Sequence, residues 1–311
     1  MSKKNKISLY ILLIAIIASI KLNAQTEPMY SQYMYNMLSI NPAYAGNREA
    51  LGLSVFYRNQ WVDLPGAPQT KSATIDGSIN DNRVGLGLQM YDDRLGVEKA
   101  TGFNGTVSTR IHVSSNGILS AGLSLGMMNY RADLTQVPNR FTPSDPAFSQ
   151  NFNQWMTTLG AGVFYNTDKF YAGVSVPNFM VSRLSTLDKV TSSIQSINDY
   201  HFFINSGVVI DMSEEVKLKP SAMLKVVSGA PLQADINCNL WLKDVVGFGL
   251  SYRTGDAVVG MLELQANKQL RFGYAYDFTT SAMGAYNQGS HEMFLRFEFG
   301  NDRIIKSTRY F

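Results

Sequence analysis

The stretch LRFGYAYDF, from Leu270 to Phe278, alternates strictly between two kinds of side chain. Every second residue is apolar or aromatic, whereas the residues between them are charged or very small. Neighbouring side chains of a β-strand point to opposite faces of the sheet. The stretch therefore predicts a strand with one apolar face and one polar face.

The same period of two recurs from Leu51 to the end of the chain. We expect about fourteen strands, at 51–60, 69–79, 83–93, 101–113, 117–130, 154–166, 169–177, 200–211, 216–227, 231–242, 245–254, 257–266, 269–279 and 290–299. Many are longer than the five or six residues usual in globular proteins, and their length suits a tilted crossing of a bilayer.

The connections between these strands differ in length in a regular way. A bacterial barrel with both termini in the periplasm alternates long outer loops with short periplasmic turns. Long connections are expected at odd positions, namely 61–68, 94–100, 131–153, 178–199 and 280–289. Connections nine and eleven, at Gly229 and Gly255, are short and break the contrast, but no even-numbered connection is long. We therefore expect an all-β fold, a transmembrane outer-membrane β-barrel of about 14 antiparallel strands over residues 51–300.

The alternative is a soluble β-sandwich, which also alternates apolar and polar faces. Here the polar face is rich in Gly and Ser and carries isolated charges, which suit a wet barrel lumen better. These charges are Arg58, Asp76, Arg110, Lys225, Asp235, Arg253, Arg271, Asp277 and Arg296. We expect them to pair with one another across the lumen, because an unpaired charge is tolerable there only where water reaches it.

Residues 1–24 have the layout of a cleaved signal peptide. Three lysines precede an apolar stretch of about 14 residues, shorter than the roughly 20 that a membrane-spanning helix needs. Removing this segment takes four of the 27 basic residues and none of the 24 acidic ones, which leaves a formal charge of −1. We expect an exported outer-membrane protein in contact with lipid. No basic surplus remains to indicate nucleic-acid binding.

Residues 25–50 do not have the pattern of a crossing strand, because prolines and glycines interrupt it, yet the segment is rich in tyrosine. It is predicted to be a lumen plug or a periplasmic segment, with Tyr33, Asn41, Pro42 and Tyr44 as its candidate contact residues. Residues 301–311 form a C-terminal tail without an assigned role.

Residues that could carry chemistry are sparse. The three histidines have no metal-binding spacing, and Cys238 has the parity of the lipid face. Ser290, His291 and Glu292 are adjacent, but neighbouring residues on a strand point to opposite faces and do not readily form one triad. Glycines that recur at period two, such as Gly85 and Gly247, are lumen-facing small residues. We expect no catalytic site, no metal and no cofactor.

Seven segments together resemble the PorP/SprF family of outer-membrane proteins of the Bacteroidetes type IX secretion system. They are SQYMYNMLSINPAYAG (31–46), YRNQWVDLPGAPQTKSATID (57–76), GLGLQMYDDRLG (85–96), KLKPSAMLK (217–225), GFGLSYRTGDAV (247–258), GYAYDFTTS (273–281) and GSHEMFLRF (289–297). They follow the family order over nearly the whole mature chain. The weakly matching stretches, 131–153 and 178–199, are the two longest predicted outer loops.

The resemblance implies a partner of the type IX machinery that receives or anchors one large secreted surface protein, often a gliding adhesin, through its C-terminal sorting domain. Binding, not catalysis, would be its mechanism. Trp61, Leu64, Pro65 and Pro68 in the first outer loop are candidates for the contact surface, since prolines reduce the entropy lost on binding. Equally, Trp61 could be an interfacial belt residue and the prolines could simply shape a turn.

Two other functions remain open at this point. One is a passive channel or small-solute transporter, and the other is a scaffold for periplasmic ring components of the secretion system. The anchor is favoured over the channel because bulky Phe56, Tyr91, Phe203 and Trp241 have inward parity and would narrow a pore.

Overall fold

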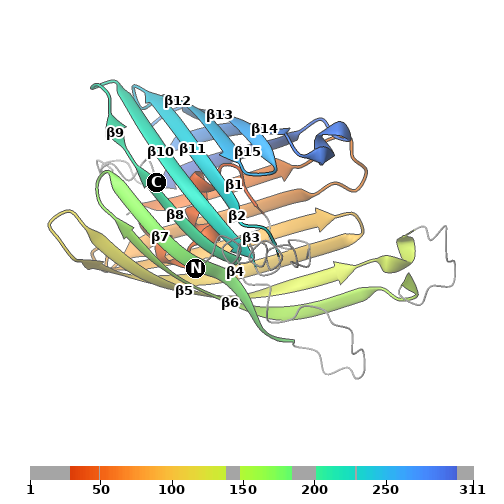
Figure 1. Ribbon diagram of the computed structural model, residues 1–311. Coiled ribbons are helices and arrows are strands. Elements are labelled where there is room, and N and C mark those ends of the chain that lie inside the picture. The colour runs from red at the N-terminus through yellow and green to blue at the C-terminus, as the bar shows by residue number, and fades with distance from the viewer. Residues whose placement is uncertain (1–28, 49, 138–147, 184–200, 228–229, 300–311) are drawn as a thin grey trace, which may run out of the picture.

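The computed structural model describes residues 29–48, 50–137, 148–183, 201–227 and 230–299 of the 311. Its antiparallel strands form one closed β-barrel, and a short helical segment near the N-terminus lies inside it (Figure 1). The predicted signal peptide and C-terminal tail fall outside the described residues.

The strands agree with the predicted ones to within a few residues at most ends. They are β1 (Leu51–Asn59), β2 (Gln69–Ile79), β3 (Val84–Leu95), β4 (Glu98–His112), β5 (Ile118–Ala132), β6 (Phe152–Asn166), β7 (Phe170–Arg183), β8 (His201–Val208), β9 (Ile210–Asp211), β10 (Val216–Val227), β11 (Gln233–Leu242), β12 (Val246–Arg253), β13 (Ala257–Gln265), β14 (Leu270–Thr279) and β15 (Ser290–Phe299).

The sheet closes because β15 pairs with β1, and β10 pairs with both β8 and β11. β8 and β9 pair with β10 in the same register and form a single crossing interrupted at Val209. The interruption lies beside Pro220 of β10, which has no N–H to donate to the ladder. The prediction of a fourteen-stranded antiparallel barrel is confirmed.

The two faces of the wall differ as the alternation predicts. Side chains on the outer face are large and apolar, and Leu250, Leu123 and Phe278 expose 66%, 63% and 63% of their surface. Cys238 is exposed on the same face. Most inward side chains are polar and buried. An apolar surface of this extent around the wall is stable in contact with lipid and would aggregate in water.

The connections follow the predicted alternation with one correction. The even-numbered ones, 80–83, 113–117, 167–169, 212–215, 243–245 and 266–269, contain three to five residues each. The third connection was predicted to be longer than the fourth, and this is wrong. β3 and β4 continue to Leu95 and Glu98, so only Gly96 and Val97 connect them. Lys99, which falls within the predicted loop 94–100, belongs to the hairpin and forms an ion pair with Asp92 at 2.8 Å.

Residues 29–48 lie within the barrel and contain three short helical turns, η1 (Tyr33–Tyr35), α2 (Met37–Ile40) and η2 (Pro42–Tyr44). Nearly every residue from Tyr30 to Arg48 is buried. Two further turns, η3 (Leu134–Gln136) and η5 (Ala282–Ala285), lie in the fifth and thirteenth connections. No helix in the described part of the chain has the length and apolar character needed to cross a membrane.

A charged substitution should destabilise the barrel where the residue faces lipid, but not where it lies in an outer connection. Leu250→Arg, in the middle of β12, should destabilise the barrel by about 2–4 kcal/mol in bilayers. Tyr286→Arg is the control, because Tyr286 is 72% exposed but lies in the thirteenth connection, outside the strands. Urea unfolding of both variants in lipid vesicles measures the difference. Equal stability of the two would contradict the membrane assignment of this face.

Candidate functional site: the plugged lumen and its outer rim

We call residues 29–48 the plug. Its backbone lies against the inner wall where the strands carry glycine. A Cβ added to Gly122 of β5 would lie 2.4 Å from the backbone nitrogen of Ala43, and one on Gly85 of β3 would lie 1.9 Å from the Ala45 carbonyl oxygen. Real Cβ atoms do not approach backbone so closely. These glycines therefore allow the plug to pack directly on the wall.

The four plug residues singled out in the sequence are all buried in the lumen. The Asn41 side chain accepts from Ala43 N–H at 2.9 Å, which caps η2, and donates to the Val163 carbonyl at 3.1 Å. Pro42 occupies the first position of η2, where no N–H is needed. Tyr44 packs edge-on against a phenylalanine of β6, with ring centroids 5.5 Å apart.

Tyr33 contacts the opposite side of the wall. Asn237 of β11 donates a hydrogen bond to its hydroxyl at 2.7 Å. Plug contacts thus reach both β6 and β11.

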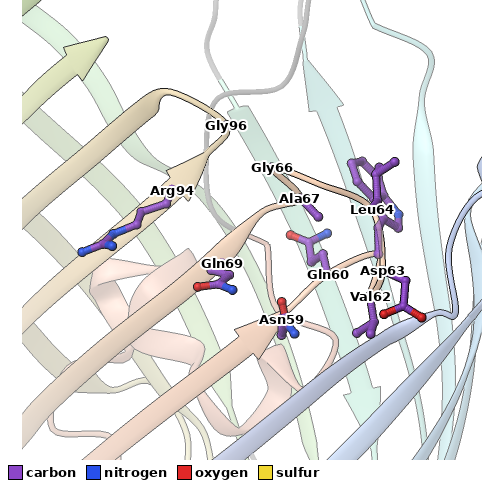
Figure 2. A pocket seen from close by; sticks show the side chains of 11 residues that line it. Asn59, Gln60, Val62, Asp63, Leu64, Gly66, Ala67, Gln69, Arg94 and Gly96 are labelled. Atoms are coloured by element: carbon purple, nitrogen blue, oxygen red, sulfur yellow. The ribbon is translucent and has the colours of Figure 1, made fainter. Parts of the chain in front are cut away.

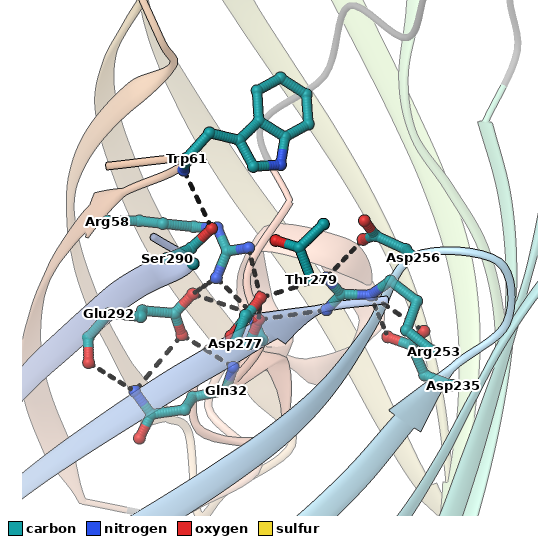
Figure 3. A network of polar contacts seen from close by, with 12 residues as sticks. Gln32, Arg58, Trp61, Asp235, Arg253, Asp256, Asp277, Thr279, Ser290 and Glu292 are labelled. Carbon is teal, nitrogen blue, oxygen red and sulfur yellow. Dashed lines mark hydrogen bonds and ion pairs between the residues drawn. The ribbon is translucent and has the colours of Figure 1, made fainter. Parts of the chain in front are cut away.

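A cluster of charges that we call the outer clasp holds the start of the plug (Figure 3). Arg58 Nη2 lies 2.7 Å from Asp277 Oδ2, and Arg58 Nη1 lies 2.9 Å from Glu292 Oε2. The Glu292 carboxylate accepts the backbone N–H groups of Ser31 and Gln32, both at 2.7 Å. Ser31 Oγ donates to Asp277 at 2.7 Å. Wall and plug are joined here by charge-assisted hydrogen bonds, which are stronger than neutral ones.

Arg253 of β12 extends the outer clasp along the wall to β11. Its guanidinium lies 3.1 Å from Asp235, 3.2 Å from Asp256 and 3.5 Å from Asp277. It also donates to Ser31 Oγ at 3.2 Å. One buried arginine therefore connects three carboxylates and the plug.

A second cluster, the inner clasp, holds the end of the plug. Arg48 lies 3.0 Å from Glu298, which also pairs with Arg296 at 3.1 Å. Gly46 N–H donates to Asp76 at 3.2 Å, and the Gly46 carbonyl accepts from Arg110 at 2.8 Å. Each backbone polar group of this glycine thus has a charged partner on the wall.

All nine charged residues predicted to face the lumen are buried inside the barrel. Seven belong to the two clasps, Arg271 instead pairs with Glu263 at 3.0 Å, and Lys225 lies on β10. Glu292 and Glu298 were not predicted as lumen charges, although they share the inward parity of Arg296 on β15. Their inward parity could have identified both glutamates from the sequence. Nothing in the sequence indicated the roles of Ser31 and Gln32, whose contacts with Glu292 use backbone N–H groups.

The first outer connection, residues 60–68, forms one side of a pocket of about 440 Å³ at the rim (Figure 2). We call this connection loop 1. Trp61 and Leu64 line the pocket, as do residues of the β3–β4 hairpin, whereas Pro65 and Pro68 are not among its lining residues. The lining consists of Asn59, Gln60, Trp61, Val62, Asp63, Leu64, Gly66, Ala67, Gln69, Arg94 and Gly96.

Loop 1 is fixed by hydrogen bonds on both sides. Val62 exchanges two backbone hydrogen bonds with the thirteenth connection, both at 2.9 Å, and Gly96 N–H donates to the Gly66 carbonyl at 2.8 Å. Trp61 N–H donates to Ser290 Oγ at 3.1 Å. Trp61 and Asp63 adopt φ angles of 46° and 70°, an uncommon conformation outside glycine that is enriched at functional sites. The loop is therefore ordered before any partner binds.

The described residues offer little support for a metal site or a catalytic triad. They contain no group of three or more His, Cys, Asp or Glu residues that could hold a metal ion. Ser290 is buried in the lumen, whereas His291, on the other face of β15, forms a hydrogen bond with Tyr274 at 2.7 Å.

The closed wall, apolar exterior and plugged polar lumen define an outer-membrane β-barrel. The sequence matches the family described as type IX secretion system membrane protein PorP/SprF over residues 22–297. The chain belongs to this family, which confirms the resemblance. The family and fold are those of a secretion-system membrane barrel rather than of an enzyme. No curated protein matches the sequence.

Solved structures with a similar arrangement are bacterial outer-membrane barrels. The CymD monoaromatic hydrocarbon channel has 12% identity and a TM-score of 0.49, with 90% of this chain and 96% of that chain covered. A Pseudomonas aeruginosa FadL homologue has 12% identity and a TM-score of 0.47, with 88% and 95% covered. Omp33 of Acinetobacter baumannii has 11% identity and a TM-score of 0.46, with 81% and 99% covered.

A bulky residue at an inward glycine should displace the plug. Gly122→Val places side-chain atoms where the Pro42–Ala43 backbone lies, so ion conductance through planar bilayers should rise above that of the wild type. Gly260→Val is the control, because Gly260 is exposed and an added Cβ meets no atom within 4 Å. Unchanged conductance of G122V would show that the plug does not block the lumen.

Removing the Glu292 carboxylate from the outer clasp should weaken the whole barrel. Glu292→Ala leaves Arg58 with one fewer partner and two plug N–H groups without their acceptor, a change that costs about 3–5 kcal/mol for a buried pair. The gel-shift temperature of the purified protein in SDS should fall. Glu214→Ala, in an exposed turn, should leave it unchanged. Similar temperatures for the two variants would show that the clasp adds no stability.

Proposed function

We propose that this barrel anchors or receives one large secreted surface protein of the gliding-adhesin type at the outer membrane, through the C-terminal sorting domain of that protein. Family membership supports a role with the type IX machinery. The observation that carries the finer proposal is the filled lumen. A barrel whose interior is occupied by its own chain suits binding at its mouth better than conduction through its centre.

The plug contacts the wall over most of its length. Glu292 and Glu298, which hold its start and its end, are six residues apart on β15. At about 3.3 Å per residue, this separation is about 20 Å along the strand. Between the clasps, the inward rings of Phe56 and Phe294 stack at 5.3 Å, and Phe294 stacks on Tyr35 of the plug at 4.9 Å. This packing opposes a continuous wet path.

Loop 1 supports the proposed binding role at the outer mouth. Its hydrogen bonds to the thirteenth connection and to the β3–β4 hairpin order it in advance, and Pro65 and Pro68 restrict it further. A preordered surface loses little entropy on binding. The pocket beside Trp61 and Leu64 offers a place for an apolar side chain of the partner, and aromatic side chains are enriched where binding energy concentrates.

Gene deletion separates this proposal from its two alternatives. Loss of one large protein from the cell surface, with the others retained, is the result expected of a dedicated anchor. Reduced uptake of a small solute with an unchanged set of surface proteins would indicate a channel. Failure of many unrelated secreted proteins together would indicate a scaffold for the periplasmic ring.

Loop 1 can be tested within the same strain. Restoring the gene as the double variant Trp61→Ala, Leu64→Ser should return normal amounts of folded barrel but release the surface protein into the medium. Tyr286→Ala, in the neighbouring outer connection, is the matched control and should retain the protein. Quantitative mass spectrometry of the cell-surface and medium fractions measures the retained and the released amounts of the surface protein. Full retention by the double variant would exclude loop 1 as the contact surface.

A further inference from the structure

The outer surface of the wall differs from one side of the barrel to the other. The outward positions of β8 and β10–β15 carry no lysine or arginine, and nearly all of them are apolar or aromatic. Four cations instead lie on the outward face of the neighbouring strands β2 to β5, one on each strand. They are Lys71, Arg94, Lys99 and Arg131, which we call the basic arc.

The basic arc lies at the outer end of the barrel. Loop 1 and the turns η3 and η5 lie at that end (Figure 1), whereas the three- to five-residue turns lie at the other. Outer-membrane barrels carry long loops outside and short turns in the periplasm. Arg94 and Lys99 are each two residues from the turn of the β3–β4 hairpin, and Gly96 of this turn bonds to loop 1. These cations are therefore on the extracellular side.

Three of the cations are direct neighbours in the sheet. The register places Arg94 opposite Lys99, and Lys99 opposite Arg131. Directly opposite side chains of an antiparallel sheet have Cβ atoms about 4.5–5.5 Å apart, and like charges in this position destabilise the sheet. The row therefore requires anions beside it.

The wall supplies two carboxylates to this row. Asp92 lies 2.8 Å from Lys99 and 3.2 Å from Arg94, and Asp133 lies 2.9 Å from Arg131. The four cations of the basic arc thus exceed these carboxylates by two charges. The side chains of Arg94, Lys99 and Arg131 are 58%, 40% and 54% exposed, so an external anion can reach all three.

Lys71 adds a charge without an ion-pair partner among the described residues. It lies opposite Asp92 in the register of β2 and β3, but that carboxylate pairs with the other two cations instead. The nearby acids Asp93 and Glu98 have inward parity and do not share the outward face. The excess positive charge of the basic arc is therefore available to a ligand outside the wall.

The surroundings of the basic arc mark the edge of the lipid layer. Tyr57, opposite Lys71 in the register, and Trp155 of β6 are exposed on the same outward face. Tyrosine and tryptophan collect at the boundary between membrane and water. Nearer the periplasm, the same faces of β3 and β4 expose Met90 and Phe103. The cations therefore lie at the level of the lipid headgroups.

We propose that the basic arc binds the phosphate groups of an anionic lipid of the outer leaflet, of the lipopolysaccharide class. Lysine and arginine bind phosphate, arginine in a bidentate manner, and basic clusters at a membrane surface recognise anionic headgroups. In this arrangement the acyl chains lie against Met90 and Phe103, and the phosphates reach Arg94 and Lys99. The site does not depend on the proposed function.

Lipid binding to the purified barrel tests the proposal. The protein is freed of lipid in detergent and titrated with lipid A, and the bound lipid is measured by native mass spectrometry. A variant that neutralises the basic arc should bind lipid A at least about tenfold more weakly than the wild type. It is Lys71→Gln, Arg94→Gln, Lys99→Gln, Arg131→Gln. The matched control removes four cations from the periplasmic turns and should bind as the wild type does. It is Arg83→Gln, Lys169→Gln, Lys243→Gln, Lys268→Gln.

Two further ligands separate phosphate recognition from apolar contact and from binding of free anions. Wild-type protein should bind dephosphorylated lipid A at least about tenfold more weakly than lipid A. Millimolar inorganic phosphate should not displace lipid A. Equal binding of the two lipids, or displacement by inorganic phosphate, would overturn the proposal.

The variants give two further ways to overturn it. Unchanged lipid A binding by the basic-arc variant would exclude these cations, and an equal loss in both variants would show an effect of net charge alone. The gel shift in SDS reports whether each variant is folded. The comparison of the two lipids uses wild-type protein only, so it decides the question even if a variant does not fold.

Discussion

The pairing of buried charges between plug and wall is the interaction on which the rest of this structure depends. A charge taken out of water costs several kcal/mol unless a partner compensates it. Glu292 obtains its partners from Arg58 on the wall and from two N–H groups of the plug, while Glu298 pairs with Arg48 of the plug. Without the plug, both carboxylates would lose partners. Wall and plug therefore stabilise each other.

This mutual dependence links the interior to the rim. β15 carries Ser290, which bonds to loop 1, and Glu292, which bonds to the plug. Both side chains point inward because they are two residues apart on one strand. On the proposed function, a load applied to loop 1 by a bound surface protein would pass to a strand whose inner face is held by ion pairs. The arrangement suits the proposed anchor, because loop 1 rests on the strand that carries Glu292 of the outer clasp.

The wall could be predicted from the sequence because alternation is a local property. The strands near Leu270–Phe278 and the inward position of Arg58 or Asp277 follow directly from parity. The hairpin at Gly96 could not be predicted in this way, because polar residues such as Arg94, Glu98 and Lys99 are equally compatible with a loop and with a projecting strand. The contacts of the plug could not be predicted from the sequence either. Ser31 and Glu292 are 261 residues apart, and the contact uses a backbone N–H that every residue but proline carries.

Inward glycines are compatible with two opposite functions, and the neighbours of these glycines decide between them. In an open barrel, small inward residues leave room for water and solute. Here the space beside Gly85 and Gly122 is taken by the backbone of Ala45 and Ala43, and an added Cβ would collide with it. The glycines thus make room for a peptide chain. A lumen shaped to hold its own amino-terminal segment this closely favours a role in which the barrel is a fixed support and recognition occurs at its outer mouth.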